Sequence, residues 1–202
     1  MNILCFGDSN TFGYMPGGWG RYDSETRFTG VLSRLLGPDH VIYEDGLCGR
    51  TTVFDEYGIP GRMGIDAIRQ SVISSSADIL FLMLGTNDCK TQFAADAPMI
   101  TAGIVKIAEA ARSARPDIKI LLCSPIMIDP LALAHADYYT QASLDTCRSL
   151  SSLYKKAAAD HGYDFMDASR FAEADPEDGE HMSPSGHAAL AEAICEKLKE
   201  LI

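Results

Sequence analysis

Ile3-Leu4-Cys5-Phe6-Gly7-Asp8-Ser9-Asn10-Thr11, near the start of the chain, is the stretch that decides the fold. A short apolar run stops at a glycine, and four polar residues follow it. This pattern predicts a buried strand that ends in a tight polar turn, with Ser9 just beyond the strand. In open parallel α/β sheets, ligands bind in the crevice beyond the carboxyl ends of the strands. Ser9 is therefore a candidate nucleophile, although such residues often only cap a helix or close a turn.

Similar apolar runs recur along the chain, with helical segments between them. They are apolar nearly throughout, which is typical of strands buried on both faces of a parallel sheet. Their alternation with helices predicts an α/β protein, a three-layer α/β/α sandwich around five strands, in one domain spanning residues 1–202. The expected strands are residues 2–6, 41–44, 79–84, 118–123 and 163–166, and the expected helices are residues 26–36, 64–74, 97–114, 141–161 and one that begins at Ser183-Pro184.

Composition narrows the class of protein. The chain has 202 residues, of which 47% are hydrophobic and 22% charged, as in soluble globular proteins. Its net charge of −11 argues against nucleic acid or an anionic membrane as a partner. No signal-peptide pattern opens the sequence, and no apolar run is long enough to span a bilayer. Six scattered cysteines without a CxxC pair predict reduced thiols in a cytoplasmic protein.

Polar residues follow the predicted strands at the same edge of the sheet. The second strand is followed by residues 46–52, which include Gly49, and the third by Gly85-Thr86-Asn87-Asp88. The fifth leads into Asp178-Gly179-Glu180-His181. Because parallel strands present their carboxyl ends at one edge, these distant segments become neighbours of Ser9.

These residues suit acyl transfer. A serine hydroxyl needs a base to take its proton, usually a histidine that a carboxylate orients. Asp178 and His181, three residues apart, can meet locally and approach Ser9 together. The oxyanion of the intermediate needs fixed donors, which the backbone N–H groups of Ser9 and Gly49 and the side-chain amide of Asn87 would supply.

Other roles are open to several of these residues. His181 could bind a metal together with Asp178 and His187, but the remaining loops offer Ser, Gly and Asn rather than metal ligands, so no metal is expected. His187 is expected to be a packed structural histidine. Asp8 and Asn10 are expected to shape the turn and hold Ser9, without a part in the chemistry.

Two loops, residues 14–25 and 125–139, follow strand ends at this edge, and either could wall a pocket or simply cover the surface. Residues 125–139 could also meet another subunit, so a homo-oligomer is left open. Transfer of an acyl group to an alcohol would require a pocket that disfavours water, and the candidates for its lining are Met15, Trp19, Phe93, Ile126 and Met127.

In order and separation, Gly7-Asp8-Ser9, Gly49, Gly85-Thr86-Asn87-Asp88 and Asp178-x-x-His181 resemble the four sequence blocks of the GDSL or SGNH esterase/lipase superfamily. The context is similar to the branch of arylesterases that also act as acyltransferases. The resemblance implies a flavodoxin-like sandwich and no metal or cofactor. It makes Ser9 the nucleophile and first oxyanion donor, Gly49 and Asn87 the other donors, and His181 the base that Asp178 positions. Asn10 departs from the name-giving motif, which has leucine there, and Cys48 replaces a residue that is small or polar in many relatives.

The leading hypothesis is a serine ester hydrolase that cleaves small-molecule, short-chain acyl esters (acetyl esters and aryl esters) through an acyl-enzyme. Transfer of the acyl group to alcohols is a second prediction within the same chemistry, and removal of acetyl groups from sugars is an alternative. From a different class, the chain could be a non-catalytic ligand-binding domain of flavodoxin-like shape. A phosphate-binding version is disfavoured, because neither G-x-x-x-x-G-K-[ST] nor G-x-G-x-x-G occurs.

Overall fold

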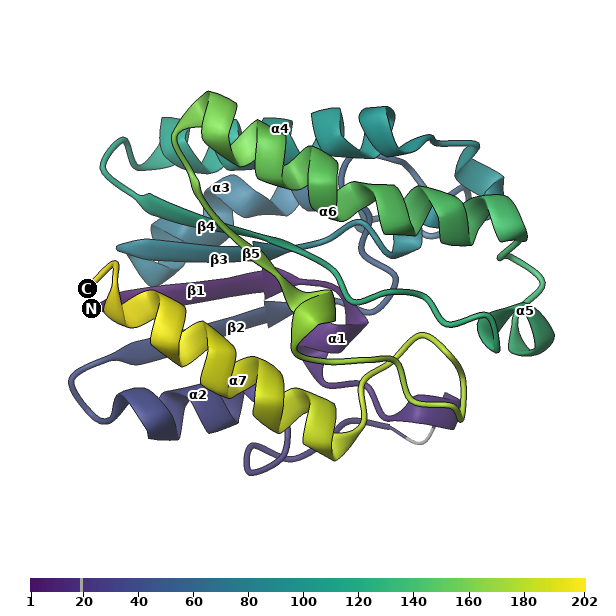
Figure 1. Ribbon diagram of the computed structural model, residues 1–202. Coiled ribbons are helices and arrows are strands. Elements are labelled where there is room, and N and C mark those ends of the chain that lie inside the picture. The colour runs from purple at the N-terminus through teal and green to yellow at the C-terminus, as the bar shows by residue number, and fades with distance from the viewer. Residues whose placement is uncertain (19) are drawn as a thin grey trace.

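The computed structural model describes residues 1–18 and 20–202, and its centre is a parallel sheet (Figure 1). Within this part of the chain the sheet has five strands in the order β2-β1-β3-β4-β5, with every neighbouring pair parallel. This is the flavodoxin-like order, in which the chain reverses direction across the sheet beside β1. The strands are β1 (Asn2–Gly7), β2 (Val41–Gly46), β3 (Ile79–Met83), β4 (Lys119–Ser124) and β5 (Asp164–Asp167).

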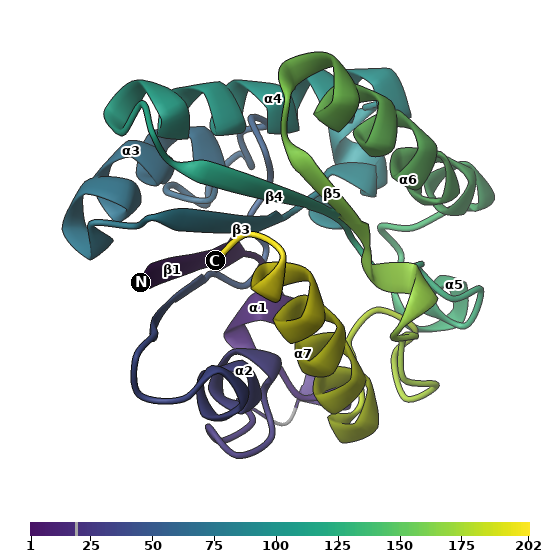
Figure 2. The ribbon, with the colours of Figure 1, turned by 60° about the vertical axis from the view of Figure 1, so that its left-hand side comes forward.

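Helices cover both faces of the sheet, as Figures 1 and 2 show. One face carries α3 (Gly64–Ser75), α4 (Ala97–Ala114) and α6 (Gln141–His161). The opposite face carries α2 (Phe28–Leu36) and α7 (Pro184–Lys199). The predicted α/β/α sandwich is therefore confirmed. Two helices of a single turn, α1 (Ser9–Phe12) and α5 (Ala132–His135), were not predicted, because four residues are too few to show a helical period.

The apolar strands serve two cores. Along β1, Leu4 and Phe6 belong to the cluster beneath α3, α4 and α6, whereas Ile3 and Cys5 belong to the cluster beneath α2 and α7. Successive side chains of a strand point to opposite faces of its sheet. A strand covered on both sides must therefore be apolar at every position, which is the pattern that the sequence shows.

The expectation of burial on both faces was wrong for β2. Its Val41 is 47% exposed and its Tyr43 37% exposed, because β2 lies at one edge of the sheet and only β1 pairs with it. The strand bounds otherwise differ from the expected ones by only a few residues.

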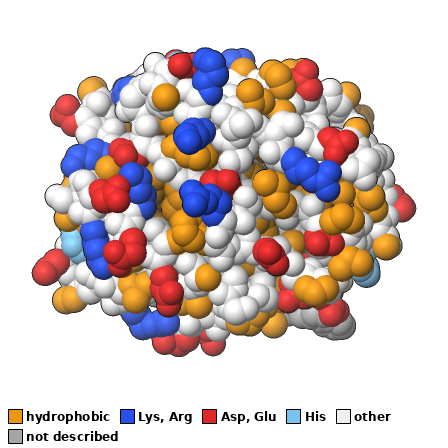
Figure 3. Space-filling view, viewed as in Figure 1, with side chains coloured by type: hydrophobic (Ala, Val, Ile, Leu, Met, Phe, Trp, Pro, Cys, Tyr) orange, Lys and Arg blue, Asp and Glu red, His pale blue; other side chains and the backbone are white. Residues whose placement is uncertain are grey.

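The distribution of charged side chains and the state of the cysteines can be compared with what the composition predicted. On the face seen in Figure 3, lysine and arginine side chains are interspersed with aspartate and glutamate. All six cysteines are free, and five of them are buried. Among residues 1–18 and 20–202, no helix combines the length and apolar character needed to cross a membrane.

Candidate active site

Ser9 stands where β1 ends and a helical turn begins. It is the first residue of α1, and the carboxylate of Asp8 caps this turn by accepting a hydrogen bond from the Asn10 N–H at 3.0 Å. Gly7 lets the end of β1 lie close to Met83 and Thr11, because a Cβ at this position would lie 2.7 Å from the Met83 carbonyl oxygen and 2.1 Å from Thr11 Oγ1. The turn holds Ser9 at the carboxyl end of the sheet with 5% of its surface exposed.

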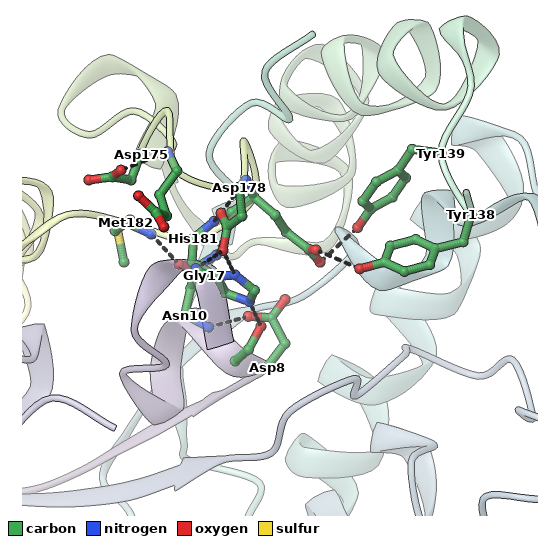
Figure 4. Close-up of polar contacts among 12 residues, drawn as sticks. Asp8, Asn10, Gly17, Tyr138, Tyr139, Asp175, Asp178, His181 and Met182 are labelled. Carbon is green, nitrogen blue, oxygen red and sulfur yellow. Dashed lines mark hydrogen bonds and ion pairs between the residues drawn. The ribbon is translucent and has the colours of Figure 1, made fainter. Parts of the chain in front are cut away.

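A line of hydrogen bonds joins Ser9 to the segment before α7. His181 Nε2 lies 2.9 Å from Ser9 Oγ, and His181 Nδ1 lies 2.8 Å from Asp178 Oδ2. Since Asp178 is ionised and can only accept, Nδ1 carries the proton and Nε2 is free to accept from the serine hydroxyl. The structure thus brings together the three residues predicted as nucleophile, base and orienting carboxylate. Figure 4 shows Asp178 and His181 next to Asn10, the residue that follows Ser9.

Four N–H groups surround the Asp178 carboxylate. Its Oδ1 accepts from the backbone N–H groups of Glu180 and His181, both at 2.9 Å, and its Oδ2 accepts from the His181 ring and from the Gly17 N–H at 3.1 Å. Burial alone would raise the pKa of Asp178, but the hydrogen bonds from His181 and Glu180 outweigh it and lower the pKa below its ordinary value. Asp178 is therefore a fixed anion beside the imidazole.

Acidic neighbours favour the protonated form of His181. Burial disfavours the imidazolium, but the hydrogen bond to Asp178 and the charges of Glu180, Asp178 and Asp8 outweigh this and raise the pKa of His181 above 6.5. Glu180 is itself buried, and it accepts hydrogen bonds from the hydroxyls of Tyr139 at 2.8 Å and Tyr138 at 3.3 Å. The ring of Tyr14 lies against the imidazole, with centroids 4.7 Å apart. The site is thus built to stabilise positive charge on His181.

Two further N–H sources line the same cavity as Ser9, namely the Gly49 backbone and the Asn87 side chain. Gly49 has a φ of +78°, a conformation that favours glycine, and a Cβ there would also displace the guanidinium of Arg62, which lies 2.5 Å from its position. Asn87 Nδ2 gives one hydrogen to the Arg50 carbonyl at 3.1 Å and keeps a second. Within the described residues, the N–H groups of Ser9 and Gly49 have no backbone or side-chain acceptor.

Contacts between the loops after β2 and β3 fix these donors relative to one another. Asp88 Oδ1 accepts hydrogen bonds from the backbone N–H of Thr52, at 2.8 Å, and from the Thr52 hydroxyl. Arg50, which follows Gly49, donates to the carbonyl of Gly7 at 2.9 Å and stacks over Phe6. The loops after three strands therefore form one connected frame.

The cavity above Ser9 has a volume of about 460 Å³ and is mostly polar. Both loops that the sequence marked as pocket walls contribute to it, the first through Tyr14 and the second through His135 and Tyr138. Sequence reasoning missed its charged lining, because no local pattern marks a lone Arg or Lys as pocket-facing. The lining consists of Ser9, Tyr14, Gly17, Gly18, Cys48, Gly49, Arg62, Asn87, Lys90, His135, Ala136, Tyr138, Glu177, Asp178, Glu180 and His181.

The predicted apolar lining was wrong for four residues. Ile126 is 1% exposed and packs in the core beneath α2 and α7, while Met127 packs against the opposite core. Phe93 packs at a tilt against Phe54, outside the cavity lining, and Met15 does not belong to that lining either. For Ile126 and Met127 the physical reason is that apolar side chains after β4 pack into the two cores and leave polar neighbours to face the cavity. Trp19, the fifth predicted lining residue, lies outside the described residues.

His187 is a packed histidine, as predicted. It is fully buried, its Nδ1 accepts a hydrogen bond from the Phe28 N–H at 3.3 Å, and its ring stacks on Phe28. Burial, with a smaller contribution from the charge of His181, lowers the pKa of His187 to about 4. In the described part of the chain, no three His, Cys, Asp or Glu side chains form a group that could hold a metal ion.

We predict that replacement of Glu180 by Gln lowers the pKa of His181. Removal of the neighbouring negative charge makes the imidazolium less favourable. The two tyrosine hydroxyls donate to different oxygens of Glu180, so in the amide the oxygen can still accept from one of them and the NH2 group can donate to the other. An NMR titration of the His181 ring measures this, with Glu192→Gln, an exposed acidic residue on α7, as the control. A His181 midpoint that stays in place or rises in Glu180→Gln would contradict the assignment.

Comparison with known proteins places this site in a family. The family model described as "GDSL-like Lipase/Acylhydrolase family" matches residues 5–189. The M. smegmatis aryl esterase is 28% identical, with 99% of each chain covered and a TM-score of 0.93. A carbohydrate acetylesterase from Sinorhizobium meliloti is 29% identical, with the same coverage and the same TM-score. No curated protein matches. The chain therefore belongs to the GDSL-like lipase/acylhydrolase family, the SGNH hydrolases, and is a carboxylic ester hydrolase.

Proposed function

We propose that the protein cleaves esters of short acyl groups, with Ser9 as nucleophile, His181 as general base and acid, and Asp178 as the carboxylate that orients the base. The observation that carries this proposal is the unbroken line from Asp178 Oδ2 through the imidazole to Ser9 Oγ, with donor–acceptor distances of 2.8 and 2.9 Å. Such distances are those at which a proton passes between a nucleophile and its base.

The reaction proceeds in two halves. Ser9 Oγ attacks the ester carbonyl while its proton moves to His181 Nε2, and the imidazolium is stabilised by Asp178. The tetrahedral intermediate collapses, His181 protonates the departing alcohol oxygen, and the acyl group remains on Ser9. Water then attacks the acyl-enzyme, gives its proton to His181, and releases the acid and the free serine.

The negative oxygen of each intermediate is held by N–H donors that are already in place. We assign this role to the backbone N–H groups of Ser9 and Gly49 and to the second hydrogen of Asn87 Nδ2. The free N–H groups of Ser9 and Gly49 support the assignment, as does the hydrogen bond that fixes Asn87 against Arg50. Donors held by the fold need no reorganisation when charge develops on the substrate.

The lining of the cavity points to small, polar esters. Arg62, Lys90, Glu177 and Glu180 border it, and charged groups are poor neighbours for a long hydrocarbon chain. Acetyl and other short acyl groups, on aryl or alkyl alcohols, fit this surface. Acetylated sugars are a second candidate, because Tyr138, Lys90 and Glu177 offer hydrogen-bond partners and an aromatic face for a polyhydroxylated leaving group.

Acyl transfer to alcohols uses the same acyl-enzyme, with an alcohol in place of water. The sequence suggested an apolar pocket that would disfavour water, but the four of its five candidate residues that the structure describes lie outside the cavity lining, and the polar lining favours hydrolysis. We therefore propose hydrolysis as the main reaction and transfer as a side reaction at high alcohol concentration.

We also propose a cytoplasmic location, which the free cysteines support.

Replacement of Ser9 by Ala should abolish hydrolysis of 4-nitrophenyl acetate, and replacement of Asn87 by Ala should lower kcat by about 10²- to 10³-fold, the usual loss for one oxyanion donor. The measurement is steady-state kinetics, with circular dichroism to show that each variant folds. Ser113→Ala, at an exposed position on α4, is the matched control and should keep full activity. Full activity in Ser9→Ala would refute the mechanism and favour a non-catalytic domain.

An ester panel separates the substrate classes. We expect kcat/KM to fall steadily from acetyl to butyryl to octanoyl esters of one alcohol, because the cavity is polar and small. The same assay with acetylated monosaccharides tests the second candidate, and added alcohol with detection of the transesterified product tests transfer. A preference for octanoyl over acetyl esters would contradict the proposed acyl specificity.

A further inference from the structure

We propose that Asn10 is a positioning residue for the catalytic base. Its side-chain amide bridges the two residues on either side of His181, and so ties the base to the short helix that carries the nucleophile. This inference rests on the proposed function, in which Ser9 and His181 exchange a proton.

The geometry of the bridge is specific. Asn10 Nδ2 donates to the Glu180 carbonyl at 3.2 Å, and Asn10 Oδ1 accepts from the Met182 backbone N–H at 3.0 Å. Both groups belong to backbone more than 160 positions away in the sequence. Figure 4 shows Asn10 in α1 beside Met182 and the Asp178–His181 segment. Asn10 is 2% exposed, so water does not compete for either bond.

The bridge requires a side chain that carries both a hydrogen-bond donor and a hydrogen-bond acceptor. An amide side chain carries both an N–H donor and a carbonyl acceptor, so Asn10 can bind the Glu180 carbonyl and the Met182 N–H at the same time. His181 lies between the two bridged residues. A shift of its backbone relative to Ser9 therefore has to break at least one of these buried hydrogen bonds.

The other contacts of this segment do not replace the bridge. The Asp175 N–H donates to the His181 carbonyl at 2.7 Å, and Asp178 binds N–H groups of Glu180 and His181, so these bonds order the segment internally. Gly17 links Asp178 to the first loop. Only the Asn10 bridge, among the side-chain hydrogen bonds of the described residues, connects α1 to the backbone on both sides of the base.

Leucine, which stands in the name-giving motif, cannot form either bond. Asn10→Leu would leave the Glu180 carbonyl and the Met182 N–H buried without partners. We expect kcat/KM for 4-nitrophenyl acetate to fall by about 10²-fold, the loss typical of a displacement of about 1 Å between reacting groups. Asn2→Leu is the matched control, since Asn2 lies at the opposite end of β1 and its side chain donates to the Ser76 carbonyl, away from the site.

Asn10→Asp is the conservative variant. It keeps an oxygen to accept from Met182, loses the donor to Glu180, and adds a negative charge near the imidazole. We expect a smaller loss than in Asn10→Leu and a shift of the acid limb of kcat/KM to higher pH, because a further negative charge raises the pKa of His181. Asn2→Asp, which adds the same charge far from the site, should leave the limb in place.

A double variant separates positioning of the base from a general structural role. If Asn10 acts through His181, then Asn10→Leu/His181→Ala should be no slower than His181→Ala alone, within about threefold, since residues that act as a unit are not additive. Asn10→Asp/His181→Ala should behave in the same way, and it decides the question if circular dichroism shows that Asn10→Leu does not fold.

The proposal is overturned if Asn10→Leu folds and keeps wild-type kinetics, or if either double variant is at least tenfold slower than His181→Ala. An unshifted acid limb in Asn10→Asp would also contradict it. Ser9→Ala, measured alongside, distinguishes this outcome from failure of the proposed function, because that variant must be inactive whatever the role of Asn10.

Discussion

Four N–H donors hold the Asp178 carboxylate as a fixed anion, and this anion orients the catalytic base of the proposed site. A half-buried anion would be costly without partners, but the Gly17 N–H, two backbone N–H groups of its own turn and the His181 ring satisfy both of its oxygens. The charge is thereby fixed at one place, with the imidazole held in the tautomer that faces Ser9. Removal of any of these donors would weaken the orientation of His181 without changing Ser9 itself.

The parallel sheet brings these groups together. Ser9, Gly49, Asn87 and His181 are spread over more than 170 positions of the chain, and each follows a strand or precedes the last helix at the same edge. This convergence could be predicted from the sequence, because apolar runs of strand length, each followed by Gly, Ser, Asn or Asp, show where strands end. The alternation of strands and helices predicts a parallel sheet but not the order of its strands. The order β2-β1-β3-β4-β5 is the flavodoxin-like one that the family resemblance implied.

The lining of the cavity could not be predicted in this way. Whether Ile126 or Tyr138 faces the cavity depends on how the connection between β4 and α6 packs, and both residues lie in that connection, on either side of α5. The apolar side chain is drawn into the core, whereas Tyr138 is held at the cavity by Glu180 and by Lys90 above its ring. The same limit applies to Asn10, whose position beside Ser9 suggested a turn residue and whose partners lie at the other end of the sequence.

The most direct test of the account is the site at which an organophosphonate ester labels the protein, since such reagents trap an activated serine. We predict a single adduct by intact mass, located by peptide mapping on the peptide that contains Ser9. The rate of labelling should rise with pH through the pKa of His181, and the adduct should be absent from Ser9→Ala. An adduct on another residue, such as the cavity-lining Cys48, or no adduct in a protein that hydrolyses esters, would contradict Ser9 as the nucleophile.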